Sequence, residues 1–273
     1  MKLINSKYEI LEQEKGMDGL YSQVELAGRT CYKSENLITP DSAYKFVTRM
    51  INAGHGAMLE HGTVYLTIEN YNDADMVKYN RNKYSRIVVT HPDNILYVTT
   101  NLRVLVDNGW MEDLQYMTSP TEYHEKRVTV KFTCDRGISH EFVRHRVFSF
   151  AQESTRYCNY SKDKFSNELT FIKPEWYDEC EDEIDKEDFE TYLINSEEYY
   201  CNLINKRGFK PQQARAILPN ALKTELVMTG FVSDWEGFFK LRDDNHAHPD
   251  AQVLAGPLHE EFIKKGYIDG RVY

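Results

Sequence analysis

The segment 141–157, "EFVRHRVFSFAQESTRY", gathers side chains that could hold an anion, although the chain as a whole is acidic. It contains Arg144, Arg146 and Arg156, and cations held close together repel one another unless an anion lies between them. An arginine fork binds phosphate or a planar electron-rich ring better than lysine does. The segment therefore predicts an anion site. A surface set of arginines paired with Glu141 and Glu153 is the alternative interpretation.

Ser154 in this segment is a candidate nucleophile or a candidate binding residue. A serine nucleophile needs a base and an oxyanion hole, and it commonly lies in a Gly-x-Ser-x-Gly turn. No such turn surrounds Ser154. The residue types alone therefore leave both roles open.

Two further residues stand in settings that suit a ligand. His55 lies between two glycines in "AGHGAMLEH", where it is free to point at a ligand or into solvent. Arg215, in "QQARAILP", is expected on the same helix face as Leu218 and Pro219. An arginine on such a buried side suggests a partner such as a carboxylate or a ligand.

Metal and P-loop chemistry find little support. "RDDNHAHPD" is rich in Asp and His, but it lacks His-Glu-x-x-His, and no Cys or His cluster has metal-ligand spacing. The Walker A loop and the Gly-x-Gly-x-x-Gly fingerprint are also missing. We therefore predict no bound metal and neither a P-loop nor a Rossmann site.

Composition limits the class of protein. The 273 residues, 41% of them hydrophobic, suit one large domain or two small ones. A formal net charge of −10 argues against a nucleic-acid partner, which would need many Lys and Arg. No apolar run reaches a membrane span, and the first residues do not resemble a signal peptide. Five cysteines without Cys-x-x-Cys spacing suggest reduced thiols, so we expect a cytoplasmic protein without a membrane partner.

The elements that must position these residues alternate irregularly between strand and helix. Apolar alternation predicts strands and a hairpin, and helical spacing predicts the remaining elements. The order lacks a regular βαβ rhythm, which favours an α+β fold. The expected strands cover about 7–13, 62–70, 127–135, 168–174 and 223–232, with a hairpin at 87–100. The expected helices cover about 21–34, 39–54, 102–109, 111–117, 136–146, 186–208, 211–218, 234–242 and 248–266.

Capping residues set several of these boundaries. Asp135 is expected to cap the helix that carries Arg144, and Pro211 suits the first position of a helix. Ser233 is expected to cap the helix that follows it, and Pro257 to bend the last helix. Residues 144 and 146 would not share a helix face, but both could project into a cleft if their helix ended near position 145.

Four ordered pieces of the sequence resemble one family, the flavin-dependent thymidylate synthases (ThyX). Its signature is Arg-His-Arg, seven residues, then Ser, and here "RHR" is followed by "VFSFAQE" and Ser154. "GHGAMLEH" is similar to the family's Gly-His-x-x-x-x-Glu-His segment, and "ARAILP" to its Ala-Arg-x-x-Leu-Pro. "FFKLR" followed by "HAHPDAQ" resembles the segment that has an arginine before His-Ala.

The resemblance implies an enzyme that makes dTMP from dUMP. Methylenetetrahydrofolate would donate the carbon, and FAD reduced by NADPH would supply the hydride. It also implies an α+β fold with a central, mostly antiparallel sheet flanked by helices. The enzyme would be a homotetramer with active sites at subunit interfaces. A non-catalytic nucleotide- or flavin-binding protein on the same scaffold is the alternative.

By the same resemblance, site residues carry over position by position. Arg242 would polarise the uracil around N3, and His55 would lie near the flavin and the folate. The implied FAD-binding residues are Arg144, His145, Arg146, His55, Gln152 and His246. The implied dUMP-binding residues are Arg144, Gln152, Ser154, Thr155, Arg156, Arg215 and Arg242.

The sequence departs from the family pattern at several places. Glu141 stands where many members have Gln, and because a carboxylate near a phosphate is unfavourable, we expect Glu141 to face elsewhere. Phe231 and Ser233 stand where many members have Asn and Arg that contact the flavin adenosine. The chain is expected to be a single catalytic domain, 1–273, in which residues 71–126 form a family insertion.

Overall fold

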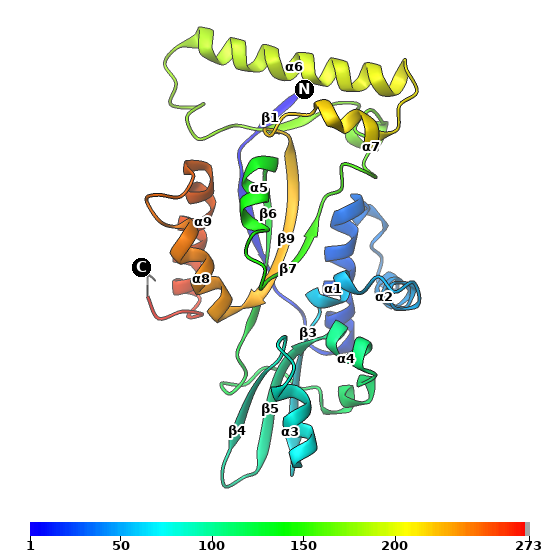
Figure 1. The fold of residues 1–273 in the computed structure, drawn as a ribbon, viewed down its shortest axis with the longest axis vertical. Helices are drawn as coiled ribbons and strands as arrows, with labels where there is room; N and C mark the ends of the chain where they lie inside the picture. The colour runs from blue at the N-terminus through cyan, green and yellow to red at the C-terminus, as the bar shows by residue number, and fades with distance from the viewer. Residues whose placement is uncertain (271–273) are drawn as a thin grey trace.

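A four-stranded antiparallel sheet lies at the centre of the molecule, of which the computed structural model describes residues 1–270 (Figure 1). In pairing order its strands are β2 (Lys7–Leu11), β6 (Arg127–Asp135), β9 (Lys223–Phe231) and β7 (Ser149–Gln152). The long β6–β9 pair forms the middle, with Thr129 opposite Thr229. The expected central antiparallel sheet is therefore confirmed.

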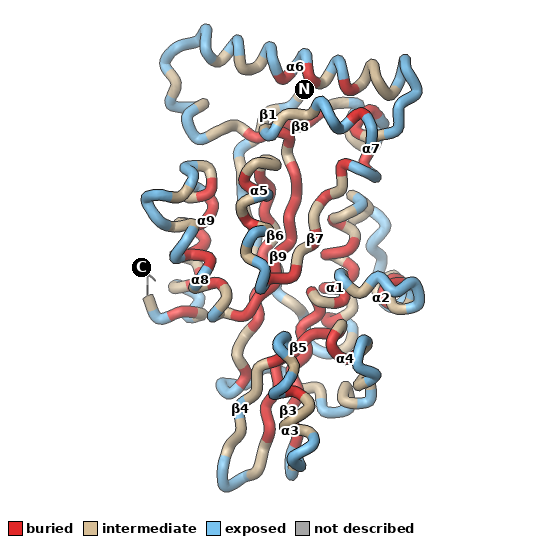
Figure 2. Tube along the Cα trace, viewed as in Figure 1, coloured by how far each residue is buried: buried red, intermediate tan, exposed pale blue. Residues whose placement is uncertain are grey.

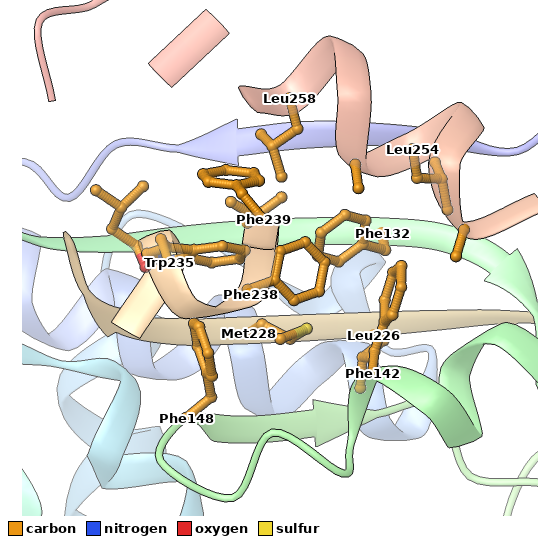
Figure 3. Close-up of a cluster of buried hydrophobic side chains, with 14 of the residues drawn as sticks. Phe132, Phe142, Phe148, Leu226, Met228, Trp235, Phe238, Phe239, Leu254 and Leu258 are labelled. Atoms are coloured by element: carbon orange, nitrogen blue, oxygen red, sulfur yellow. Dashed lines mark hydrogen bonds between the residues drawn. The ribbon is translucent and has the colours of Figure 1, made fainter. Parts of the chain in front are cut away.

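Helices cover both faces of this sheet. Alternate residues of β6, such as Val130 and Phe132, pack against α8 (Val232–Arg242) and α9 (Pro249–Lys264). Figure 3 shows Phe238 of α8 between the side chains of β6 and β9. On the other face, Ala27 of α1 (Gly16–Tyr32) packs with the small apolar side chains of β7 and β9. Because successive side chains of a strand point to opposite faces of the sheet, each strand contributes apolar side chains to both layers.

A second antiparallel sheet extends beyond one end of the first. Its order is β3 (Thr63–Glu69), β5 (Ile95–Asn101) and β4 (Arg86–Thr90), and the β4–β5 hairpin was expected from the sequence. The surrounding helical segments are α2 (Ser42–Asn52), η2 (Gly56–His61), α3 (Asp73–Asn80), α4 (Leu102–Asn108) and η3 (Met111–Tyr116).

At the opposite end, α6 (Glu183–Asn205) lies across the molecule above the pair β1 (Lys2–Ile4) and β8 (Thr170–Ile172) (Figure 1). In Figure 2 much of α6 is exposed, whereas the middle of β6 and β9 is buried. The remaining elements are η1 (Glu35–Leu37), α5 (Arg136–Phe142), η4 (Asp163–Phe165), α7 (Pro211–Ala214) and η5 (Arg215–Ile217).

The sequence-based elements are confirmed in kind, with some differences. The strands β1 and β7 and the helix α3 were not predicted. Ser233 does not cap α8, because the helix begins one residue before it and the N-cap position is Phe231. Ser233 Oγ instead donates to Glu125 Oε1 at 2.5 Å. Helix α9 continues through Pro257.

The described residues contain neither a membrane-spanning helix nor a disulfide bond. Across residues 1–270, no helix has the length and apolar character needed to cross a membrane. The five cysteines all lie in this range, and each is a free thiol.

Candidate functional site

Arg242, the last residue of α8, is held by α5 and the turn that follows it. Its Nη1 contacts Oε2 of Glu141 at 2.5 Å, and its Nη2 donates to the main-chain oxygen of Glu141 at 2.9 Å. Its Nε donates to Nε2 of His145 at 3.0 Å. The Glu141 carboxylate therefore faces Arg242, and its expected orientation away from a bound phosphate stays a prediction.

The local fold explains how these residues meet. Asp135 caps α5 by accepting a hydrogen bond from the Ile138 N–H at 2.9 Å, as predicted from the sequence. The helix ends at Phe142, whose ring lies 5.0 Å from that of Phe238 on α8. The ring of His145 also packs on Phe238, at 5.1 Å. This aromatic contact presses the end of α5 against α8.

His145 is neutral near pH 7 in this setting. Burial and the adjacent Arg242 cation lower the pKa of His145 to about 4. Since Nε2 accepts the hydrogen bond from Arg242, the single ring proton belongs on Nδ1.

Arg144 and Arg146 lie on the turn after α5, and both are exposed. Neither guanidinium group has a hydrogen bond or ion pair with a side chain of residues 1–270. Burial lowers the pKa of Arg242, and the nearby Arg144 cation lowers it further. The turn therefore presents two cations that are available to an anion.

An open cavity lies beside Arg242 and Glu141, between the end of α8 and the start of α9. His246 and His248 line it, together with Asp244. His246 is almost fully exposed, at 95%, and its Nδ1 contacts Asp244 at 2.8 Å. No group of three or more His, Cys, Asp or Glu side chains in the described range is arranged to hold a metal ion.

Glu141 and His248 also line a second cavity, together with the exposed Trp176. The two cavities are thus neighbours that share one wall. The His248 side chain accepts the Asp250 N–H at 3.2 Å and caps α9, which fixes this wall.

The Ser154 loop forms a second group of candidate residues. Ser154 N–H donates to the Cys31 carbonyl at 3.0 Å, and Ser154 Oγ accepts the Arg156 N–H at 3.3 Å. Within residues 1–270 no base contacts this hydroxyl. Thr155 Oγ1 accepts a hydrogen bond from Arg215 Nη1 at 3.3 Å. The loop gathers two guanidinium groups around polar donors.

The prediction that Arg215 lies on the buried face of a helix is wrong. Helix α7 ends at Ala214, and Arg215 begins a short 3₁₀ turn in which it is exposed. The helix is too short to present a common face with Leu218. Arg156, also exposed, contacts Gln212 of α7 at 3.2 Å, so both arginines face solvent.

Gln152 lies on the strand that leads into the Ser154 loop, and its side chain contacts α5. This residue of β7 donates from Nε2 to Ser139 Oγ of α5 at 2.8 Å and to Thr224 Oγ1 at 3.3 Å.

His55 belongs to neither group by direct contact. It occupies the N-cap position of η2, it is exposed, and its ring has no partner in residues 1–270. The nearby His61 is fully buried, and its Nδ1 contacts Thr229 Oγ1 at 2.8 Å. Burial and the Arg127 cation lower the pKa of His61 to about 3, so this buried ring is neutral near pH 7.

A buried charge cluster beneath the Ser154 loop was not predicted. Glu225 on β9 contacts Lys33 at 2.8 Å, Lys131 at 2.8 Å and Lys223 at 3.2 Å. Lys223 also contacts Glu153 at 2.6 Å. Burial alone would raise the pKa of Glu225, but Lys223 and Lys33 lower it to about 2. Charged residues in otherwise apolar strands were the available signal.

Comparison with known proteins places this site in a family. Residues 108–265, more than half of the chain, match the model described as thymidylate synthase complementing protein (Thy1). The chain belongs to this family.

Several relatives carry a more specific name. A flavin-dependent thymidylate synthase of Pyrococcus furiosus is 32% identical over 135 residues, which cover 50% of this chain and 53% of the relative. One from Mycolicibacterium gilvum is 24% identical over 261 residues, which cover 90% and 76%. A probable flavin-dependent thymidylate synthase of Paramecium bursaria Chlorella virus 1 is 28% identical over 144 residues, which cover 50% and 67%. The chain spans about half the length of the Pyrococcus relatives.

Proposed function

We propose that this protein is a flavin-dependent thymidylate synthase that converts dUMP to dTMP. Its carbon donor is 5,10-methylenetetrahydrofolate, and its hydride source is FAD reduced by NADPH. The family match and the names of the relatives support the reaction class. The observation that carries the proposal is Arg242, oriented by Glu141 and His145 at the edge of an open cavity.

The residues around the Arg-His-Arg turn fit a flavin cofactor. Arg144 and Arg146 are exposed cations without partners in residues 1–270, as a pyrophosphate group requires. The neutral His145, the exposed His246 and His55 offer ring nitrogens to the same ligand. Together with Gln152, these residues would hold FAD. Bound FAD, after reduction by NADPH, would supply the hydride that the reaction needs.

The Ser154 loop and its neighbours would bind dUMP. Arg156 and Arg215 are exposed guanidinium groups suited to the phosphate, while Ser154, Thr155 and Gln152 provide polar hydrogen-bonding groups. Arg144 would border the same pocket.

Arg242 would polarise the uracil ring through hydrogen bonds near N3. A cation placed where negative charge develops favours attack by C5 on the carbon unit. No serine nucleophile takes part, because Ser154 Oγ has no base partner in the described range.

The functional unit is a homotetramer whose active sites lie at subunit interfaces. This arrangement rests on the resemblance to the ThyX family, which implies that a neighbouring subunit completes each site. Each subunit is one catalytic domain of the ThyX type. We also propose that residues 71–126 form an insertion in that domain, although the family match already begins at residue 108.

Two measurements test the proposed function. Purified protein should show flavin absorbance, either as isolated or after addition of FAD. It should then release tritium from C5 of labelled dUMP when folate and NADPH are present. Flavin binding without tritium release would favour the non-catalytic alternative, and absence of both would contradict the flavin enzyme altogether.

A further inference from the structure

Glu141 holds Arg242 through two different oxygens. Its carboxylate contacts Nη1 at 2.5 Å, and its own main-chain oxygen accepts from Nη2 at 2.9 Å. The side chains of Glu141 and Arg242 are only 29% and 15% exposed, so water screens the pair weakly. One residue therefore fixes both terminal nitrogens of the guanidinium group.

We propose that Glu141 is a positioning residue that aims Arg242 at the nucleotide and, through Arg242, holds His145 as its Nδ1–H tautomer. The inference rests on the proposed function for the ligand of Arg242. The tautomer of His145, in contrast, can be measured without any ligand.

The donor count of Arg242 supports the first half of the inference. A guanidinium group has five N–H donors in a fixed plane. One N–H of Nη1, one of Nη2 and the single N–H of Nε are used by Glu141 and His145. The two remaining N–H groups have no partner in residues 1–270. Because the plane is rigid, fixing three donors fixes the direction of the other two.

The second half follows from the Nε hydrogen bond. His145 Nε2 can accept from Arg242 Nε only when that ring nitrogen carries no proton. The neutral ring must then carry its proton on Nδ1, which is offered to a ligand as a donor. If Arg242 moved away, Nε2 would be free to take the proton, and the tautomers would mix.

The charge of Glu141 matters less than its position in this scheme. A glutamine side chain has an oxygen that can accept the same Nη1 hydrogen bond, whereas alanine removes the acceptor. An aspartate keeps the charge, but its side chain is one methylene group shorter, so the carboxylate lies farther from Arg242. The three substitutions therefore separate geometry from charge.

Nitrogen-15 NMR of the His145 ring in the full-length protein tests the inference without substrate. The wild-type protein should show the Nδ1–H form at pH 7, and Glu141→Gln should retain it. Glu141→Ala and Glu141→Asp should both show mixed tautomers. Asp107→Asn, which alters an exposed carboxylate 2.9 Å from Arg103, is the matched control and should resemble the wild type. Resonances are assigned with His145→Gln.

Kinetics provide the second readout. Since a misplacement of about 1 Å can cost roughly a hundredfold in rate, Glu141→Ala should lower kcat by about that factor. Glu141→Gln should stay within about tenfold of the wild-type kcat, because the hydrogen bond survives. Rescue by glutamine but not by aspartate is the pattern that distinguishes positioning from charge.

Clear results would overturn the inference. If Glu141→Ala is folded and keeps the wild-type tautomer of His145, Glu141 does not position this pair. If Glu141→Ala does not fold, the same conclusion follows from an unchanged tautomer in Glu141→Asp. A protein that shows the expected tautomers but neither binds flavin nor releases tritium would contradict the proposed function and leave the positioning intact.

Discussion

Arg242 Nε donates a hydrogen bond to His145 Nε2 across 3.0 Å, although 97 positions separate the two residues in the chain. Helices α5 and α8 bring them together because Phe142 and Phe238 pack ring against ring. The contact joins the Arg-His-Arg turn to the arginine proposed to activate the nucleotide. It is therefore the natural place to test the proposed chemistry.

Arg242→Ala should abolish most turnover while dUMP still binds. Removing one preorganised donor from a site of developing charge typically costs about 10²–10³ in kcat. Tritium release from labelled dUMP measures turnover, and calorimetry measures the dUMP Kd. Unchanged turnover in the variant would show that Arg242 does not activate the nucleotide.

Arg242→Ala should also raise the pKa of His145. In the wild type, burial and the arginine cation hold this pKa at about 4, below the usual 6.5, so the ring stays neutral from pH 5 to 8. Loss of the cation leaves burial alone to lower the pKa. An NMR titration of the ring measures the change, and a lower pKa in the variant would contradict the electrostatic account.

Ser154→Ala should retain tritium release and bind dUMP more weakly. A hydroxyl that acts only as a hydrogen-bonding group contributes about 1 kcal/mol, or about a fivefold change in Kd. Ser161→Ala, which alters a hydroxyl of the same β7–β8 segment that contacts Asn159 and Asn205, is the control for loss of a nearby hydroxyl. Complete loss of tritium release from folded Ser154→Ala would instead favour a serine nucleophile.

Subunit complementation should reveal whether the active site spans two chains. Arg156→Ala and Arg242→Ala are each expected to be inactive as homotetramers. Co-expressed in equal amounts, they should regain about a quarter of wild-type activity, because random assembly of a symmetric oligomer unites two intact halves at that frequency. Mixed oligomers without activity would show that each site uses Arg156 and Arg242 of one chain.

Glu225 should make folding stability depend on acid pH. Its folded pKa of about 2 lies below the ordinary 4.5, so its stabilising effect is complete above pH 4.5 and is lost as pH falls toward 2. The shift corresponds to a stabilisation on the order of 3 kcal/mol. Denaturation monitored by circular dichroism between pH 2 and 7 measures this dependence.

In Glu225→Gln the same pH dependence should be weaker. The variant should also be less stable at pH 7 by about 3–5 kcal/mol, because three lysines lose their common partner. Glu183→Gln, at an ion pair whose carboxylate is 84% exposed, should change stability by less than about 1 kcal/mol. Equal effects of the two substitutions would contradict the role of burial.

Local patterns in the sequence were enough to predict much of the fold. Strands β3 and β6 alternate clearly, and the Asp135 cap marks the start of α5. The four residues of β7 are too few to show a period, and their pairing with β9 depends on the rest of the sheet. Helix α3 has little apolar periodicity, although Asn72 and Asp75 form a capping box that could have marked it.

The site was predictable in its residue types but not in its contacts. The motifs indicated Arg144, Arg242 and Ser154 as candidates, and their roles stay predictions. The contact between Glu141 and Arg242 depends on the docking of α5 against α8, which no local pattern reports. Arg215 was misplaced because α7 stops before it.

The short strand β7 lies between Arg146 and Ser154, and its pairing constrains how many residues can separate them. Its four residues pair in fixed register with β9, where Gln152 lies opposite Leu226. One added residue would turn every following side chain to the other face of the sheet, whereas many substitutions would leave the register unchanged. Substitutions between Arg146 and Ser154 should therefore be tolerated far better than insertions or deletions there, both in natural variants and in engineered ones.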